Sequence, residues 1–276
     1  MLHLQMSQLK IGFIGAGNMA QSIGLGLLKN GFHISQLMYS SPSRGNHQPL
    51  IDNKFTCTKE NRLLVQSSDV IILATKPQQA AEALHSLKQE FIGKCLISIA
   101  AGLTTETLKQ YVANDCAIIR CMPNTPALVG EGITGLFAES QTRRQYGPIA
   151  ENIFASVGQW VWIDTEQQMD VVTAISGSGP AYFFLMIESL ISAGVEQGLD
   201  KDVAQQLAVQ TMNGAAALLK KDPRTPTELK VAVTSPGGTT AAALTSLEKD
   251  DYEHIIHNAV AAATLRGKQL AAQSKK

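Results

Sequence analysis

The chain has 276 residues, and its 23 basic and 23 acidic side chains give a formal net charge of zero. A hydrophobic content of 45% and a charged content of 17% exclude an intrinsically disordered protein. The charge balance argues against a broad electrostatic surface for nucleic acid or for an anionic membrane, so we expect a small-molecule partner.

Targeting and metal-binding signals are weak throughout the sequence. We expect no membrane-spanning segment, because no apolar run approaches the roughly 18 residues that a bilayer requires. Residues 1–9 lack the pattern of a secretion signal, which favours a cytoplasmic protein. The four cysteines form no CxxC pair and are expected to be mostly buried free thiols. His254 and His257 have no further histidine or cysteine near them in the sequence, so we expect no metal site.

The first predicted strand and helix enclose a glycine-rich turn. The strand covers residues 10–14, and the helix covers residues 19–29 before Asn30-Gly31. Gly15 permits a tight turn, Gly17 lets the backbone approach a pyrophosphate, and Ala20 allows close packing of helix on strand. The free N–H groups at the helix N-terminus favour phosphate binding. This context predicts a dinucleotide site, although similar turns also occur without one.

The second predicted strand, residues 37–39, is followed by hydroxyl groups and not by an acid. NAD-binding proteins usually place Asp or Glu about 20 residues after the glycine turn to hold the ribose. Here the segment contains Ser40, Ser41 and Arg44, and the first carboxylate is that of Asp52. Hydroxyl and guanidinium groups donate to a 2′-phosphate, which a carboxylate would repel. We therefore expect NADPH, with NADH as a second possibility; the alternative is a polar loop whose Arg44 faces water.

Short apolar strands alternate with helical stretches over the first 160 or so residues. This alternation predicts a doubly wound, mostly parallel sheet covered by helices, an α/β fold. The predicted strands are residues 10–14, 37–39, 55–58, 70–74, 95–99, 117–121, 133–138 and 161–164.

From Glu166 onward the pattern is helical, with long segments at 181–197, 201–221 and 252–273 and a linker marked by Pro223 and Pro226. We therefore expect an N-terminal Rossmann domain over residues 1–164 and an all-helical domain over residues 165–276. The helix at 181–197 is apolar around most of its circumference. A second subunit is expected to cover it; the alternative is a central core helix.

Ligands of an open parallel sheet bind beyond the carboxyl ends of its strands. Three turns occupy such places. Thr75-Lys76-Pro77 is expected near the adenosine and ribose, Ala100-Ala101-Gly102 near a flat ring, and the turn that contains Asn124 near the nicotinamide. Each of the three is also compatible with ordinary turn chemistry.

Two further glycine-rich segments lie in the helical half, at residues 176–180 and 234–240. In the second, Gly237 and Gly238 expose consecutive N–H groups, and Thr239 and Thr240 add hydroxyls at the start of a helical run. Such an arrangement suits a small carboxylate, so we expect the substrate here. A capped helix after a Pro-Gly turn is the alternative.

From Ile11 to about Leu270 the chain resembles the pyrroline-5-carboxylate reductases. The resemblance lies in five motifs in the order of that family: GFIGAGNMA at 12–20, ATKP at 74–77, MPNTP at 122–126, SGSGPAY at 176–182 and TSPGGTT at 234–240. It implies a Rossmann domain for NADPH and a helical domain that forms a homodimer, which some members assemble into a larger ring such as a decamer. It also implies reduction of 1-pyrroline-5-carboxylate to L-proline, the last step of proline biosynthesis.

The turns and the resemblance together give the expected site residues. Those expected to bind the cofactor are Gly15, Ala16, Gly17, Asn18, Met19, Ala20, Ser40, Ser41, Pro42, Arg44, Asn61, Ala74, Thr75, Lys76, Pro77, Ala100, Ala101 and Asn124. Those expected to bind substrate are Ser235, Gly237, Gly238, Thr239 and Thr240, and Thr240 is the expected catalytic residue. The chain departs from the family at 230–233, where many members carry a polar residue, and at Arg44, which lies later than the arginine of some relatives.

Two other functions share these features. A β-hydroxyacid dehydrogenase would use a lysine on a long helix of the second domain, but residues 181–197 contain no lysine. A non-catalytic NADPH-sensing module would need no substrate cradle, so the intact turn at 234–240 argues against it.

Overall fold

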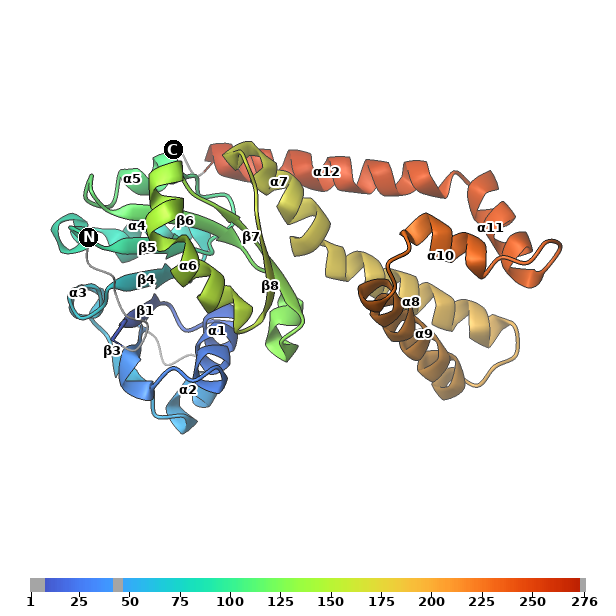
Figure 1. Ribbon diagram of the computed structural model, residues 1–276, viewed down its shortest axis with the longest axis horizontal. Coiled ribbons are helices and arrows are strands. Elements are labelled where there is room, and N and C mark those ends of the chain that lie inside the picture. The colour runs from blue at the N-terminus through green and yellow to red at the C-terminus, as the bar shows by residue number, and fades with distance from the viewer. Residues whose placement is uncertain (1–7, 42–46, 274–276) are drawn as a thin grey trace. The chain divides into compact units, whose positions relative to one another are not determined.

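The computed structural model describes residues 8–41 and 47–273 (Figure 1). They divide into two compact units, one within Met1–Ser178 and Ala262–Lys276 and the other comprising Gly179–Ala261. The first unit contains every described strand, and the second unit is helical.

The first unit is built on an eight-stranded sheet with the order β3-β2-β1-β4-β5-β6-β7-β8. All neighbouring strands are parallel except β6 and β7, which are antiparallel. The mostly parallel α/β fold predicted from the sequence is therefore confirmed. The strands are β1 (Ile11–Ile14), β2 (Leu37–Ser40), β3 (Thr56–Thr58), β4 (Val70–Leu73), β5 (Cys95–Ser98), β6 (Ala117–Met122), β7 (Gly132–Phe137) and β8 (Gly158–Trp162).

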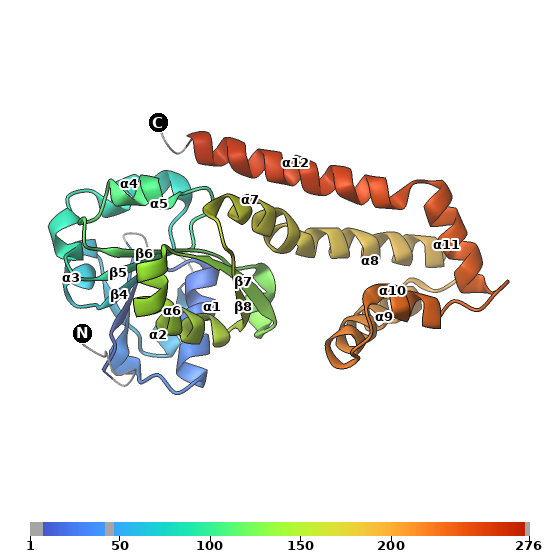
Figure 2. The same cartoon turned by 45° about the horizontal axis from the view of Figure 1, so that its top comes forward.

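Both faces of the sheet are covered, which explains why its central strands are continuous apolar runs. Successive side chains point to opposite faces, so Phe13 and Ile14 of β1 enter different cores. Ile23 of α1 and Phe154 of α6 pack with Phe13, whereas Leu64 of α3 packs with Ile14. Figure 2 shows α4 and α5 on one side of the sheet and α1 and α6 on the other. The helices between the strands are α1 (Asn18–Lys29), α2 (Gln48–Asp52), α3 (Asn61–Gln66), α4 (Pro77–Leu84), α5 (Thr105–Lys109) and α6 (Ser140–Ala155). Three short 3₁₀ turns accompany them: η1 (Ile34–Gln36), η2 (Lys88–Phe91) and η3 (Thr125–Val129).

The first unit extends beyond the boundary expected at residues 164/165. The next segment contains η4 (Glu166–Gln168), α7 (Met169–Val172) and the π-helical turn η5 (Thr173–Gly177). Glu166 accepts hydrogen bonds from the Thr105 N–H at 2.7 Å and from Arg120 Nη1 at 3.2 Å. Because Arg120 is only 4% exposed, its charge requires such a carboxylate partner. Residues 166–178 therefore pack with the sheet.

The second unit contains helices α8 (Gly179–Glu196), α9 (Lys201–Lys221), α10 (Pro226–Ala232), α11 (Thr239–Lys249) and the first part of α12 (Tyr252–Gln273). The expected linker around Pro223 and Pro226 is shorter than predicted, because Pro226 begins α10. Thr225 and Glu228 form a reciprocal capping box there, with the Glu228 N–H donating to Thr225 Oγ1 at 3.2 Å.

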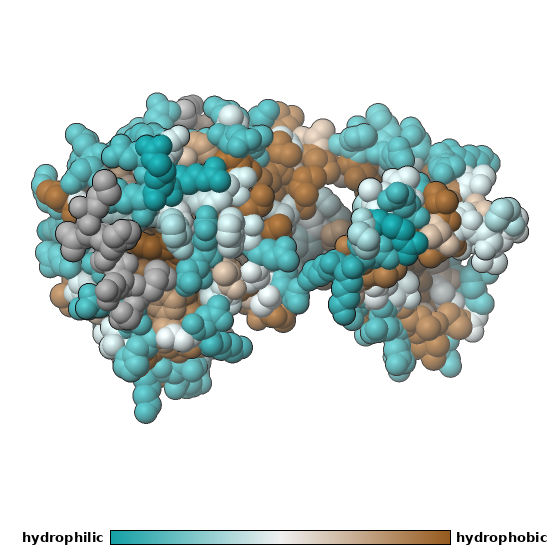
Figure 3. Space-filling view, viewed as in Figure 1, coloured by the Kyte–Doolittle hydropathy of each residue, from teal (hydrophilic) through white to brown (hydrophobic). Residues whose placement is uncertain are grey.

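Helix α8 carries large apolar side chains on its surface in the single chain. Phe183, Phe184 and Leu185 are 58%, 64% and 63% exposed, and Figure 3 shows hydrophobic patches on the surface of this unit. By length and composition alone, the helical stretch Glu166–Glu196 is apolar enough to cross a membrane. The sequence contains no uninterrupted apolar run of that length, and we therefore expected no membrane-spanning segment. The mean hydropathy of a helix is a less strict criterion, because it tolerates Ser and Gly within the helix.

Candidate functional site

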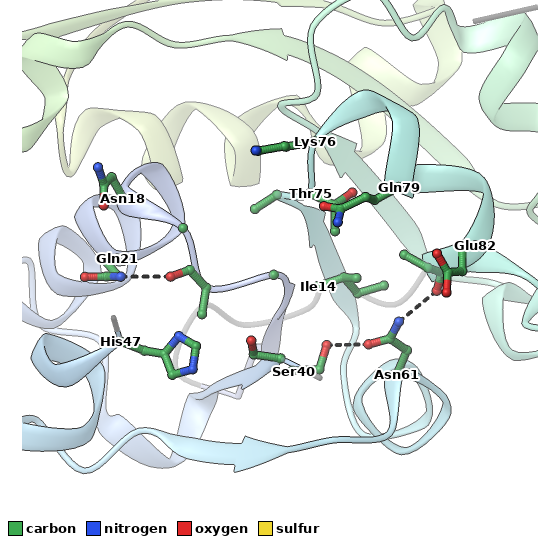
Figure 4. A pocket seen from close by; sticks show the side chains of 16 residues that line it. Ile14, Asn18, Gln21, Ser40, His47, Asn61, Thr75, Lys76, Gln79 and Glu82 are labelled. Atoms are coloured by element: carbon green, nitrogen blue, oxygen red, sulfur yellow. Dashed lines mark hydrogen bonds between the residues drawn. The ribbon is translucent and has the colours of Figure 1, made fainter. Parts of the chain in front are cut away.

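A cavity of about 620 Å³ opens at the carboxyl ends of β1, β2 and β4 in the first unit (Figure 4). The turn between β1 and α1 forms one wall, and Ser40 of β2 and Asn61 of α3 form another. The turn after β4 and the start of α4 complete the lining. This is the edge at which open parallel sheets bind their ligands.

Glycine is required in the turn between β1 and α1. Gly15 has φ +101, and a Cβ there would lie 2.7 Å from the Ala74 carbonyl oxygen. Its N–H donates to the Ser40 carbonyl at 2.9 Å, which fixes the turn against β2. A Cβ on Gly17 would meet no atom within 4 Å, so this residue borders open space at the start of α1. The first amides of a twelve-residue helix thus border the cavity, an arrangement that suits a phosphate.

The end of β2 is fixed by a hydrogen-bond relay. The fully buried Ser40 donates from Oγ to Asn61 Oδ1 at 2.6 Å, and Asn61 Nδ2 donates to the Ala83 carbonyl at 2.9 Å. Figure 4 shows Asn61 directed toward Ser40 across this corner. In the described lining, Glu82 of α4 is the one acidic side chain. The absence of a carboxylate from the end of β2 is compatible with a ribose that carries a 2′-phosphate.

The cavity also contains an unsatisfied buried hydroxyl. Thr75 Oγ1 has no hydrogen-bond partner among the described residues, although it is shielded from solvent. A buried polar atom without a partner costs free energy, which a ligand hydroxyl or ring nitrogen would recover. Together with the glycine turn, this atom makes the cavity fit a dinucleotide.

The structure brings ten of the predicted cofactor residues into this lining: Gly15, Ala16, Gly17, Asn18, Ser40, Ser41, Asn61, Ala74, Thr75 and Lys76. Six others do not line it: Met19, Ala20, Pro77, Ala100, Ala101 and Asn124. Pro42 and Arg44 lie outside the described residues.

Two of the residues outside the lining have structural roles. Ala20 is 1% exposed and packs in the core between α1 and the sheet. Asn124 is 8% exposed, and its Oδ1 accepts a hydrogen bond from the Ile133 N–H at 2.9 Å. The Asn124 side chain therefore joins the turn after β6 to β7.

The cavity includes residues that the sequence reasoning missed. Gln21 donates from Nε2 to the Ala16 carbonyl at 2.8 Å and so supports the glycine turn. His47 reaches the lining from the start of α2, and its ring centroid lies 5.7 Å from that of Tyr39. Gln21 lies one helical turn after Gly17, so helical periodicity could have identified it; no comparable signal marks His47. The remaining missed residues are Ile14, Gln79, Glu82 and Ala83.

The turn expected to bind substrate lies in the second unit. Gly237 has φ +69, and the Gly238 N–H donates to the Ser235 carbonyl at 3.0 Å. Gly238 is the N-cap of the eleven-residue helix α11, so Thr239 and Thr240 are its first two residues. The backbone N–H groups at this position have no partner within the helix, and Ser235 is exposed. The geometry is that of an open anion cradle.

Residues 176–180 take a different form from a simple turn. The π-helical turn η5 places the Ser178 N–H 2.8 Å from the Thr173 carbonyl, which accepts its hydrogen bond. A Cβ on Gly177 would lie 2.7 Å from Met122 Cε, so glycine allows this turn to approach the end of β6.

The four cysteines differ in their burial. Burial raises the pKa of the Cys116 thiol to about 12 and raises the pKa values of Cys95 and Cys121 well above their usual range. These three thiols are therefore poor nucleophiles, whereas Cys57 is exposed. The described residues contain no group of three potential metal ligands.

Two family models match the chain. Residues 166–270 match the model described as pyrroline-5-carboxylate reductase dimerisation, and residues 10–102 match the model described as NADP oxidoreductase, coenzyme F420-dependent.

Curated relatives match the chain over almost its whole length. It is 42% identical to a pyrroline-5-carboxylate reductase of Haemophilus influenzae over 263 residues, covering 94% of this chain and 97% of that protein. It is 39% identical to the Arabidopsis thaliana pyrroline-5-carboxylate reductase, with 98% of each chain covered.

Solved structures give the same result. A Plasmodium falciparum pyrroline carboxylate reductase with NADP bound has a TM-score of 0.86 at 36% identity, covering 97% of this chain and 100% of that one. A Coxiella burnetii pyrroline-5-carboxylate reductase has a TM-score of 0.90 at 36% identity, covering 97% and 99%. A Pseudomonas putida protein described as a putative oxidoreductase shares the fold at 14% identity, with a TM-score of 0.62.

Proposed function

The chain belongs to the pyrroline-5-carboxylate reductase family, and we propose that it reduces 1-pyrroline-5-carboxylate to L-proline with NADPH, the last step of proline biosynthesis. One observation carries the proposal: the likeness to curated reductases at 36–42% identity over 94% or more of the chain. We assign cofactor binding to residues 1–164, and substrate binding and dimerisation to residues 165–276.

The cavity of the first unit supports the choice of cofactor. The amides at the start of α1 would hold the pyrophosphate, and the Ser40 and Ser41 corner would hold the adenosine ribose. Thr75 Oγ1 has a free hydrogen-bonding capacity that a bound nucleotide would use. When bound, NADPH supplies the hydride that reduces the C=N bond; NADH is the second candidate for the same cavity.

The open turn at 235–240 supports the assignment of the substrate site. We assign the substrate carboxylate to the backbone N–H groups of Gly237 and Thr239, with Ser235 and Gly238 beside them, because the Gly238 N–H already donates to the Ser235 carbonyl. Thr240 is assigned as the catalytic residue whose hydroxyl hydrogen-bonds the ring nitrogen. A protonated imine is already electrophilic, and the product amine retains that proton, so these residues need only bind and orient the ring.

The exposed apolar surface of α8 supports a homodimer. Phe183, Phe184 and Leu185 are more than half exposed in the single chain, and a second copy would bury them. A bilayer would also bury this helix, but the match of residues 166–270 to a dimerisation model favours the protein partner. We further propose a cytoplasmic enzyme without nucleic-acid or membrane partners, in which dimers can assemble into a larger ring such as a decamer.

Absorbance of NADPH in the presence of pyrroline-5-carboxylate tests the proposed reaction, with a parallel series in NADH. We expect rapid oxidation of NADPH that depends on the imine, and Thr240→Ala should lower kcat/KM at least about tenfold, as loss of a charge-assisted hydrogen bond predicts. Thr245→Ala is the matched control, because Thr245 lies on the same helix and donates to the Ala241 carbonyl. If saturating imine causes no oxidation, a dehydrogenase of another class or an NADPH sensor becomes the better assignment.

A further inference from the structure

Among the described residues that line the cofactor cavity, His47 is the one histidine. It directly precedes α2, and Figure 4 shows its ring directed into the cavity on the side where Ser40 lies. Because Ser40 ends β2 and Ser41 follows it, this corner is where the adenosine ribose of a Rossmann-bound dinucleotide lies. His47 therefore stands beside the one position at which NADPH and NADH differ.

The imidazole is supported by a buried aromatic ring. The Tyr39 and His47 ring centroids lie 5.7 Å apart with planes tilted by 55°. Tyr39 is 2% exposed, and burial raises its pKa to about 12, with Cys57 adding to the shift. Its phenol therefore remains neutral at any pH of interest. A neutral aromatic face accommodates an imidazolium without introducing a competing negative charge.

Three charged side chains of the described residues lie on the elements around this corner of the cavity, Asp52 on α2 and Lys76 and Glu82 on the α4 side. Asp52, at the end of α2, accepts a hydrogen bond from Gln48 Nε2 at 2.7 Å. Glu82 and Lys76 line the same cavity from the α4 side, and Figure 4 shows Lys76 on a different side of the cavity from His47. Gln21, which faces the cavity from α1, is uncharged.

Accepting NADPH as the cofactor of the proposed function, we propose that His47 contacts the 2′-phosphate and that its protonation makes the preference for NADPH over NADH dependent on pH. An imidazolium forms a charge-assisted hydrogen bond with a phosphate, whereas neutral imidazole forms a weaker one. Phosphate binding favours the charged ring. Its contribution is therefore fully present at low pH and is lost as the pH rises through the range in which the bound imidazolium gives up its proton.

Calorimetric titration with 2′,5′-ADP and 5′-AMP isolates this contact without the need for turnover. At pH 6.0 we expect His47→Gln to weaken 2′,5′-ADP binding by about tenfold, the size of one charge-assisted hydrogen bond. At pH 8.5 wild type and His47→Gln should bind 2′,5′-ADP about equally. Binding of 5′-AMP should differ little between the two proteins at either pH. His85→Gln is the control, since His85 is an exposed histidine outside the lining whose ring bonds to Ser86.

His47→Lys provides a second variant with a permanent charge. It should retain tight binding of 2′,5′-ADP at both pH values and so remove the difference between them. Equal losses for 5′-AMP and 2′,5′-ADP in His47→Gln, or a loss that is the same at pH 6.0 and 8.5, would overturn the proposal. If wild type binds neither probe, the proposed cofactor cavity itself fails; if both bind and only the pH effect is missing, the role of His47 alone is wrong.

Discussion

Arg120 and Glu166 form a largely buried ion pair with an Nη1 to Oε1 distance of 3.2 Å. The pair joins the middle of β6 to the segment that follows β8. Glu166 also accepts two hydrogen bonds from Thr105, at 2.7 Å from its N–H and 2.8 Å from its Oγ1. The carboxylate of Glu166 in η4 thus connects this turn to both α5 and β6.

Removal of that carboxylate should cost much of the stability of the first unit. We expect Glu166→Ala to lower the free energy of unfolding by roughly 3–5 kcal/mol, because Arg120 would remain buried with only Asp170 nearby. Glu139→Ala is the matched control. Glu139 pairs with Lys109, both side chains are more than half exposed, and its removal should cost less than about 1 kcal/mol. Urea unfolding measures both, and equal losses would contradict a special role for the buried pair.

Gly15→Ala should damage both stability and cofactor binding. The new Cβ would lie 2.7 Å from the Ala74 carbonyl oxygen at a φ of +101, so the turn must move. We expect a loss of roughly 2–4 kcal/mol in unfolding free energy and at least about tenfold weaker NADPH binding. Gly31→Ala is the control that separates backbone strain from steric overlap. Gly31 also has a positive φ, +90, but a Cβ there would meet no atom within 4 Å. This substitution should cost about 1 kcal/mol and leave NADPH affinity unchanged.

Ser41→Asp should reverse the cofactor preference. A carboxylate at the end of β2 would repel a 2′-phosphate and could accept a hydrogen bond from a free 2′-hydroxyl. At about 5 Å and an effective dielectric constant near 20, the repulsion between two unit charges is about 3 kcal/mol, which lowers the affinity for NADPH roughly 200-fold. NADH affinity should rise or stay constant. Ser41→Asn, which adds no charge, is the control, and a similar loss of NADPH affinity in Asn would point to a steric cause.

Alkylation by iodoacetamide should distinguish the four thiols. Cys57 is exposed and should react in the native protein at pH 8. Burial raises the pKa of Cys116 to about 12 and raises the pKa values of Cys95 and Cys121 well above their usual range, so these thiols have almost no thiolate at that pH and should react only after unfolding. Mass spectrometry should therefore find one modified site in the native wild type and none in Cys57→Ser. Native labelling of Cys95 would mean that the sheet opens locally.

The sheet was predictable because most of its strands are short apolar runs bounded by clear turns. All eight predicted strands are present, and each of their ends lies within three residues of the predicted one. The antiparallel β6 and β7 pair carries no local signal, since the hydrophobic pattern of a strand does not encode the direction of its neighbour. Helix α10 was missed because Pro223 and Pro226 favoured a linker, whereas Pro226 occupies the first helical turn, where its lack of an N–H is harmless.

The candidate site was predictable where the backbone determines it. The glycine turn and the residues after β2 and β4 line one cavity because parallel strands end at a common edge. Asn124 follows β6 at this edge too, but its side chain is held by the Ile133 N–H, a long-range contact that residue spacing does not reveal. His47 lies directly before α2 and lines the cavity, but no periodic pattern in the sequence marks this position.

The reversal of strand direction at β7 decides how the chain leaves the sheet. Because β8 runs parallel to β7, it ends at the edge opposite the cofactor cavity, and α7 and η5 provide the return path. Two glycines let this path lie flush on the strands: a Cβ on Gly135 would lie 2.5 Å from Val172 Cγ1, and one on Gly177 would lie 2.7 Å from Met122 Cε. Insertion of a single residue within α7 would rotate the residues after it by about 100° about the helix axis and displace the close approach of Gly177 to Met122. The number of residues in α7 and η5 is therefore constrained by the close approach at these two glycines.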